Sequence, residues 1–175
     1  MLSIQVYKTG GFCIYASMQD NQIRIQVFAS TRDQSRKLIL SKDESLLLQH
    51  VEGLANNMLW IFGHIVRTTD FLLLKLSGQP MQFPTELDAW FAKGSSPAQW
   101  QNTNGLKEKL IDAEAKCQKH ILDYLASSDL DAPFADPYTT SSGMVLGSLG
   151  AALLYNTMHE GIHLGQLQLY NKLVK

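Results

Sequence analysis

The chain has 175 residues, of which 45% are hydrophobic and 18% are charged, as is usual for a folded globular protein and unlike a disordered chain. This length suits one domain with a single hydrophobic core. The formal net charge of −1 offers no broad basic surface to a phosphate backbone, so nucleic acid is not an expected partner.

The compartment is predicted from cysteine content and from apolar segments. Two cysteines, Cys13 and Cys117, are too few for a disulfide framework and indicate a reducing environment. Residues 1–17 lack a basic segment ahead of their apolar residues, so they make a poor signal peptide. The longest nearly apolar stretch, residues 144–155, is shorter than the roughly 20 residues that cross a bilayer. We therefore expect a cytoplasmic protein with no membrane partner.

Helical periodicity begins near residue 20 and predicts a first helix over residues 20–40. The charged segment within it, residues 31–37, is expected to face solvent without a function. Residues 1–17 hold two short apolar runs around Gly10–Gly11. They are predicted to form either a small hairpin or an extension ahead of a domain that spans residues 18–175.

Three further helices follow in the chain. The second is predicted over about residues 56–78, because a glycine and then a proline at its end supply stop signals. Apolar residues spaced by three and four predict an amphipathic third helix over residues 107–126, on which Cys117 is expected to be an inert buried side chain. The fourth is predicted from residue 141 or 142 to Leu173.

Two long connectors separate these helices. Residues 79–104 and 127–140 are rich in proline, glycine and aspartate, which is more typical of a crossover than of a tight turn. A β-rich fold is disfavoured, because the long segments have a period of 3.6 residues rather than two. The sequence therefore predicts an all-α fold, a four-helix bundle with long crossover connections.

The strongest chemical signal is the segment His159-Glu160-Gly161-Ile162-His163. Histidines four residues apart on a helix project from one face, so both can bind one metal ion. The segment matches the HExxH pattern of zinc proteases, in which the glutamate is the general base. However, the 12 residues after His163 include no histidine, cysteine or carboxylate, and Gln166 stands where the longer metzincin pattern needs glycine. A third ligand must come from upstream.

His64 is the preferred third ligand. It lies in the middle of the second helix among apolar residues, where burying a polar ring without a partner costs about 1–3 kcal/mol. Metal coordination would offset that cost. A lone core histidine is more often a packing residue, but three histidines on two long helices favour a metal site. His50 and His120 are expected at the surface.

Helical geometry extends the site around these histidines. The residues that share their helical stripes are expected to line a substrate pocket: Asn57, Trp60, Thr68, Phe71, Tyr155, Asn156 and Tyr170. Glu160 lies on the flank of its stripe and Gln166 on the stripe itself, and both are candidates for orienting a ligand or moving a proton. Asp70 lies well round the second helix and is expected to cap or pair elsewhere.

Residues 56–78 and 153–173 closely resemble the DinB-like superfamily of small bacterial proteins. This damage-inducible or bacillithiol-transferase-like group is distinct from the DNA polymerase that shares its name. The most specific parts of the resemblance are WxxGH at Trp60–His64 and HEGxHxGQ at His159–Gln166. The resemblance extends over most of the chain from about residue 20.

The resemblance implies a bundle in up-down-down-up order that is commonly dimeric. It also implies one divalent metal ion, zinc or nickel, held by His64, His159 and His163. Characterised members of the superfamily include thiol S-transferases that use low-molecular-weight thiols and a mycothiol-dependent isomerase.

Three functional hypotheses follow. The preferred one is a metal-dependent thiol S-transferase that uses a low-molecular-weight thiol as cosubstrate and acts on small electrophiles. The second is a non-catalytic, stress-related bundle in which the ion mainly joins the second and fourth helices. The third is metal-dependent hydrolysis with Glu160 as the base. The sequence alone leaves all three open.

Overall fold

The structure is a computed structural model that describes residues 12–174. The part of the chain that it describes contains four long helices: α1 (Phe12–Leu40), α3 (Met58–Leu73), α5 (Leu106–Ser127) and α6 (Leu149–Leu173). Shorter elements join them: α2 (Glu44–Leu47), η1 (Lys75–Ser77), α4 (Thr85–Asp88), η2 (Pro97–Gln99), β1 (Pro133–Thr139) and β2 (Val145–Ser148).

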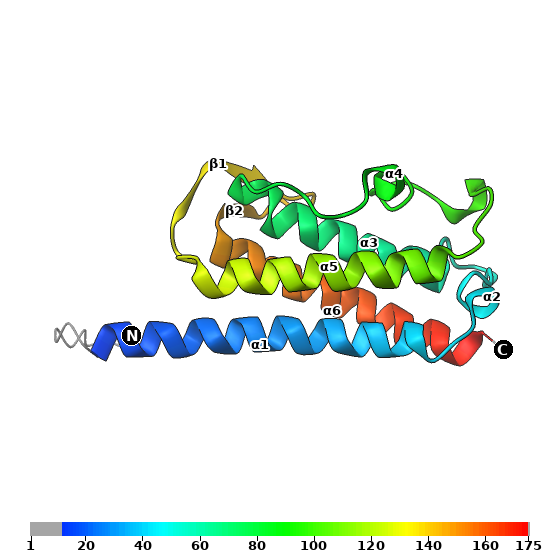
Figure 1. Ribbon diagram of the computed structural model, residues 1–175, viewed down its shortest axis with the longest axis horizontal. Helices are drawn as coiled ribbons and strands as arrows, with labels where there is room; N and C mark the ends of the chain where they lie inside the picture. Colours follow the sequence, from blue (N-terminus) through cyan, green and yellow to red (C-terminus); the bar gives the residue numbers. More distant parts are fainter. Residues whose placement is uncertain (1–11, 175) are drawn as a thin grey trace.

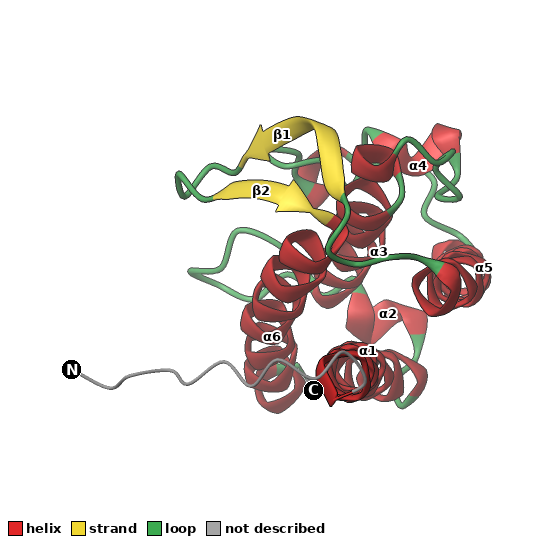
Figure 2. Ribbon diagram, turned by 90° about the vertical axis from the view of Figure 1, so that its left-hand side faces the viewer, coloured by secondary structure: helices red, strands yellow, loops and turns green. Residues whose placement is uncertain are grey.

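The four long helices form the predicted bundle. In Figure 1, α1 and α6 run in one direction and α3 and α5 run in the other, which is the up-down-down-up order. Figure 2 shows the four helices at the corners of one bundle, with the strand pair to one side of α3. Because α3 and α5 are parallel, the chain between them must return along the length of the bundle.

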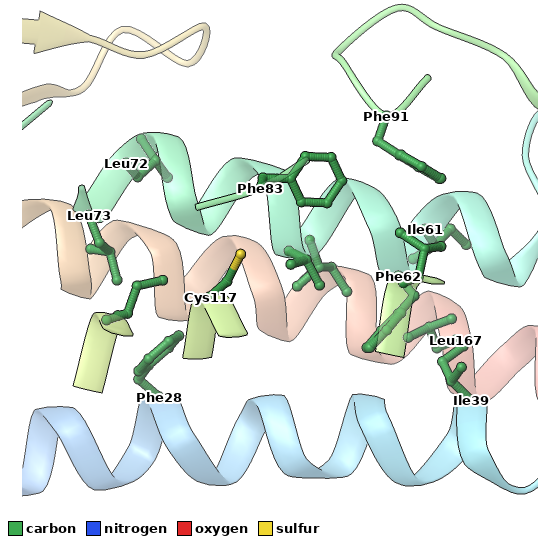
Figure 3. Close-up of a cluster of buried hydrophobic side chains, with 14 of the residues drawn as sticks. Phe28, Ile39, Ile61, Phe62, Leu72, Leu73, Phe83, Phe91, Cys117 and Leu167 are labelled. Atoms are coloured by element: carbon green, nitrogen blue, oxygen red, sulfur yellow. The ribbon is translucent and has the colours of Figure 1, made fainter. Parts of the chain in front are cut away.

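All four helices contribute side chains to one core. Phe28 and Ile39 from α1, Phe62 from α3, Cys117 from α5 and Leu167 from α6 are fully buried and lie in one cluster, as Figure 3 shows. Burial raises the pKa of the Cys117 thiol to about 12. A thiol that stays protonated at neutral pH is a poor nucleophile, which confirms the prediction of an inert side chain.

The first helix is longer than predicted. It begins at Phe12 rather than near residue 20, so residues 12–15, predicted as one half of a hairpin, are helical. The other half of that predicted hairpin falls in residues 1–11, outside the described residues.

The second and third helices match their predicted ranges closely. Asn57 caps α3 by accepting a hydrogen bond from the backbone N–H of Trp60 at 2.8 Å. The helix ends in η1, after which Gly78 adopts a left-handed conformation with φ of 73°. At the start of α5, Glu44 of α2 accepts from the backbone N–H of Lys107 at 2.7 Å.

The fourth helix starts later than predicted, at Leu149 rather than at residue 141 or 142. The preceding residues form an antiparallel hairpin of β1 and β2, in which Thr139 pairs with Val145. Gly143 has φ of 84° in its turn, and Ser148 caps α6 at its true start. The apolar run that suggested one helix is therefore divided between a strand and a helix.

Candidate metal centre

The structure brings the three predicted ligands together from α3 and α6. The ring centroid of His64 lies 5.4 Å from that of His159 and 5.1 Å from that of His163. The centroids of His159 and His163 are 4.5 Å apart. One nitrogen from each ring lies within 4.8 Å of the others. The helical spacing explains His159 and His163, while the packing of α3 on α6 supplies His64.

The distance between the nitrogens of His159 and His163 suits a shared metal ion. Zinc binds imidazole nitrogen at about 2.0–2.1 Å, so two nitrogens of a tetrahedral site lie about 3.3 Å apart. The Nε2 atoms of His159 and His163 are 3.2 Å apart. A set of three nitrogen ligands leaves coordination positions open, which is typical of catalytic rather than structural zinc sites.

Two of the rings are oriented by hydrogen bonds on their far side. His64 Nδ1 lies 2.8 Å from the backbone carbonyl oxygen of Phe91, and His163 Nδ1 lies 2.7 Å from Oε1 of Gln166. With the proton on Nδ1 as the donor, the Nε2 lone pair remains free for a metal. Nδ1 of His159 is buried and has no partner among the described residues.

The three rings favour the neutral form. Burial, together with the neighbouring His163, lowers the pKa of His64 to about 4 and that of His159 to about 3. Burial also lowers the pKa of His163. Coordination requires a neutral imidazole, so at neutral pH the cluster is ready to bind metal without first losing protons.

The comparisons with known proteins decide the family. A family model described as the DinB superfamily matches residues 28–167, a range that includes all three histidines. The chain belongs to the DinB superfamily. A comparison with curated proteins finds no match to the sequence.

A solved structure supports the fold of this DinB-superfamily protein. A conserved protein from Enterococcus faecalis is similar to it with a TM-score of 0.63. The two share 14% sequence identity, and the similarity covers 87% of this chain and 95% of the other. At this identity the likeness concerns the fold alone.

Two aromatic residues predicted for the pocket of this DinB-superfamily protein lie against the ligands. Trp60 stacks on His64 with ring centroids 4.8 Å apart and an angle of 8° between the planes. Tyr155 lies nearly parallel to His159 at 6.5 Å. These rings provide flat, largely apolar walls beside the cluster.

Other predicted pocket residues have structural contacts. The hydroxyl of Tyr170 donates to the backbone carbonyl of Asn56 at 2.6 Å, next to the helix cap at Asn57. Thr68 is half-buried on α3. Phe71 packs on Tyr138 of β1 and borders a cavity of about 530 Å³. None of the three histidines lines this cavity, so the structure does not support the prediction that Phe71 lies beside them.

Glu160 has a partner that the sequence analysis missed. Its two carboxylate oxygens accept from Nε and Nη2 of Arg32 at 2.5 and 3.1 Å, and Nη2 also donates to Thr69 Oγ1 at 2.8 Å. Thr69 in turn bonds to Asn156, another predicted pocket residue, which is fully buried. Arg32 is 1% exposed, so the prediction that residues 31–37 only face solvent is wrong for it.

The burial of Glu160 bears on the hydrolase hypothesis. A general base must reach a water molecule, but Glu160 is 0% exposed and both of its oxygens face Arg32. This geometry disfavours hydrolysis with Glu160 as the base.

The helical spacing of residues on α1 would have indicated that Arg32 is buried. Phe28, Arg32, Ser35 and Ile39 follow a spacing of four, three and four residues, and all four are buried. Arg32 therefore occupies a core position of α1, where a charged side chain requires a buried partner.

Among the described residues, no helix combines the length and apolar character that a membrane crossing requires.

Proposed function

We propose that this protein is a divalent-metal-dependent thiol S-transferase that joins a low-molecular-weight thiol to a small electrophile. The observation that carries the proposal is the cluster of three histidines from α3 and α6, with one ring nitrogen of each within 4.8 Å of the others. The chemistry supplied by bound zinc or nickel would be a lowered thiol pKa at the open position. We place this activity in the cytoplasm, where such thiols are kept reduced.

The residues of the chain have distinct parts in this proposal. His64, His159 and His163 hold the ion, and Gln166 keeps His163 in the tautomer that frees its Nε2. Trp60 and Tyr155 give the electrophile a flat surface to lie on. In the reaction a sulfur–carbon bond forms, the leaving group departs with its electron pair, and the thiol proton is released.

The activity is tested with purified protein loaded with zinc or nickel. Bacillithiol and glutathione are each supplied with a model electrophile such as chlorodinitrobenzene, and loss of thiol is followed. We expect turnover that a chelator abolishes and added metal restores. Inactivity with every combination of thiol and metal would contradict the proposal.

A non-catalytic role is the second candidate. The ligands come from two helices that are distant in the chain, so a bound ion would join α3 to α6 directly. In that case a chelator lowers the melting temperature and no thiol or electrophile is consumed.

We also propose a homodimer that forms through the outer face of α1 and α6. These helices pack side by side, and each exposes large apolar side chains: Leu154, Met158 and Ile162 on α6, and Ile23 and Val27 on α1. Exposed apolar side chains on neighbouring helices are typical of an interface when they gather on one face. Sedimentation velocity is expected to give a dimer for the wild type and a monomer for Ile162→Glu.

A further inference from the structure

The connector between α3 and α5 lies against the helix that carries His64. It returns along the bundle because α3 and α5 are parallel, and Figure 1 shows it with α4 on the outer side of α3. Its contacts with α3 follow a regular order.

The first contacts are near the C-terminal end of α3. Asp70, predicted to pair away from the site, accepts from the backbone N–H groups of Gln82 and Phe83 at 2.7 and 2.9 Å. About one turn earlier, Arg67 donates from Nε and Nη2 to the two carboxylate oxygens of Asp88 at 3.0 and 3.2 Å. Paired contacts of this kind fix the direction of both groups as well as their distance.

The next contacts reach the metal centre. The carbonyl oxygen of Phe91 bonds to His64 Nδ1, and the Phe91 ring lies where a Cβ at Gly63 would stand. Trp60, which stacks on His64, donates from Nε1 to Ser95 Oγ at 2.9 Å. The connector thus contacts His64 and the aromatic ring that lies on it.

The contacts between α3 and the connector follow one another in a regular order along both segments. The α3 partners, residues 70, 67, 64 and 60, follow one another at spacings of three or four residues along the helix. The connector partners rise from residue 82 to residue 95 as the α3 positions fall. The contact between His64 and Phe91 therefore lies between two others, Arg67 with Asp88 on one side and Trp60 with Ser95 on the other.

We infer that residues 82–95 act as a positioning strap for His64, in which the Arg67–Asp88 ion pair holds the Phe91 carbonyl where it fixes the tautomer and orientation of the ring. Arg67 and Asp88 touch no ligand atom of the cluster, so they are positioning residues that act through Phe91. The inference rests on the proposed metal centre. Partners behind a metal-binding histidine commonly change metal affinity about 10–100-fold.

The test uses the full chain with Asp88→Ala, Arg67→Met and both together. Asp123→Ala is the matched control, because it breaks the exposed Lys119–Asp123 ion pair on α5. Two quantities are measured: the protonated nitrogen of His64 by ¹⁵N NMR in chelator-treated protein, and Zn²⁺ affinity by competition with a chelator.

The wild type and the control are expected to carry the His64 proton on Nδ1. Each strap variant is expected to show a mixture of tautomers and Zn²⁺ affinity at least about tenfold weaker. The double variant should lose no more than the larger single effect, since both changes break one contact. Asp88→Asn keeps one acceptor for Arg67 and should give a smaller loss, which preserves the test if Asp88→Ala fails to fold.

A lower melting temperature with an unchanged tautomer and unchanged Zn²⁺ affinity would overturn the inference, because the strap would then only stabilise the fold. If the wild type binds neither Zn²⁺ nor Ni²⁺, the proposed function fails. The tautomer of His64 in the metal-free variants still decides whether the strap positions the ring.

Discussion

Replacing Glu160 by glutamine is expected to lower the free energy of unfolding of the metal-free protein by about 3–5 kcal/mol, the usual cost of breaking a buried ion pair on one side. Burial acts to lower the pKa of Arg32, but the Glu160 carboxylate, with a smaller contribution from Glu114, more than offsets this and the pKa is raised. Arg32 therefore stays charged, and the substitution removes the carboxylate that accepts hydrogen bonds from its Nε and Nη2, leaving nearby Glu114, which itself pairs with Arg36, as the remaining negative charge. Urea unfolding in the presence of a chelator measures the loss.

Two variants control this experiment. Asp123→Asn weakens an exposed ion pair on α5 and is expected to cost no more than about 1 kcal/mol. Arg32→Met combined with Glu160→Leu removes both charges and is expected to recover most of the lost stability, because apolar pairs often replace buried ion pairs without net cost. If Glu160→Gln lowers the free energy of unfolding no more than Asp123→Asn does, the buried ion pair contributes no more to stability than an exposed one.

Zinc is expected to stabilise the wild type strongly, and asparagine at His64, His159 or His163 is expected to abolish that effect. An ion that binds only the folded state adds about 4 kcal/mol to the free energy of unfolding at a concentration a thousand times its Kd. Each substitution removes one of three nitrogen ligands. Thermal unfolding with Zn²⁺ and with a chelator gives the difference for each variant.

His120→Asn and His50→Asn are matched controls, since both histidines are exposed, as the sequence predicted. They are expected to keep the full zinc-dependent stabilisation. Equal stabilisation of the control and ligand variants would mean that zinc binds elsewhere on the surface, and it would remove the basis for the metal centre.

Much of the bundle was predictable because helix periodicity depends on nearby residues. The buried positions of α5, such as Leu110, Cys117 and Ile121, recur at the spacing of one helical face. The pairing of His159 with His163 follows from the same geometry. The strand pair was missed because the apolar run before α6 continues into the helix, while the turn depends on Gly143.

By itself, the sequence determined the four helices, the ligand face of α6 and the family to which the chain is similar, since each depends on residues within a few turns of one another. Only the tertiary structure decided which side chains meet from distant segments. Arg32 and Glu160 are 128 residues apart, so no local pattern connects them. The acceptor behind His64 is a backbone carbonyl, a group that every residue has, and the folded path of the connector alone selects that of Phe91.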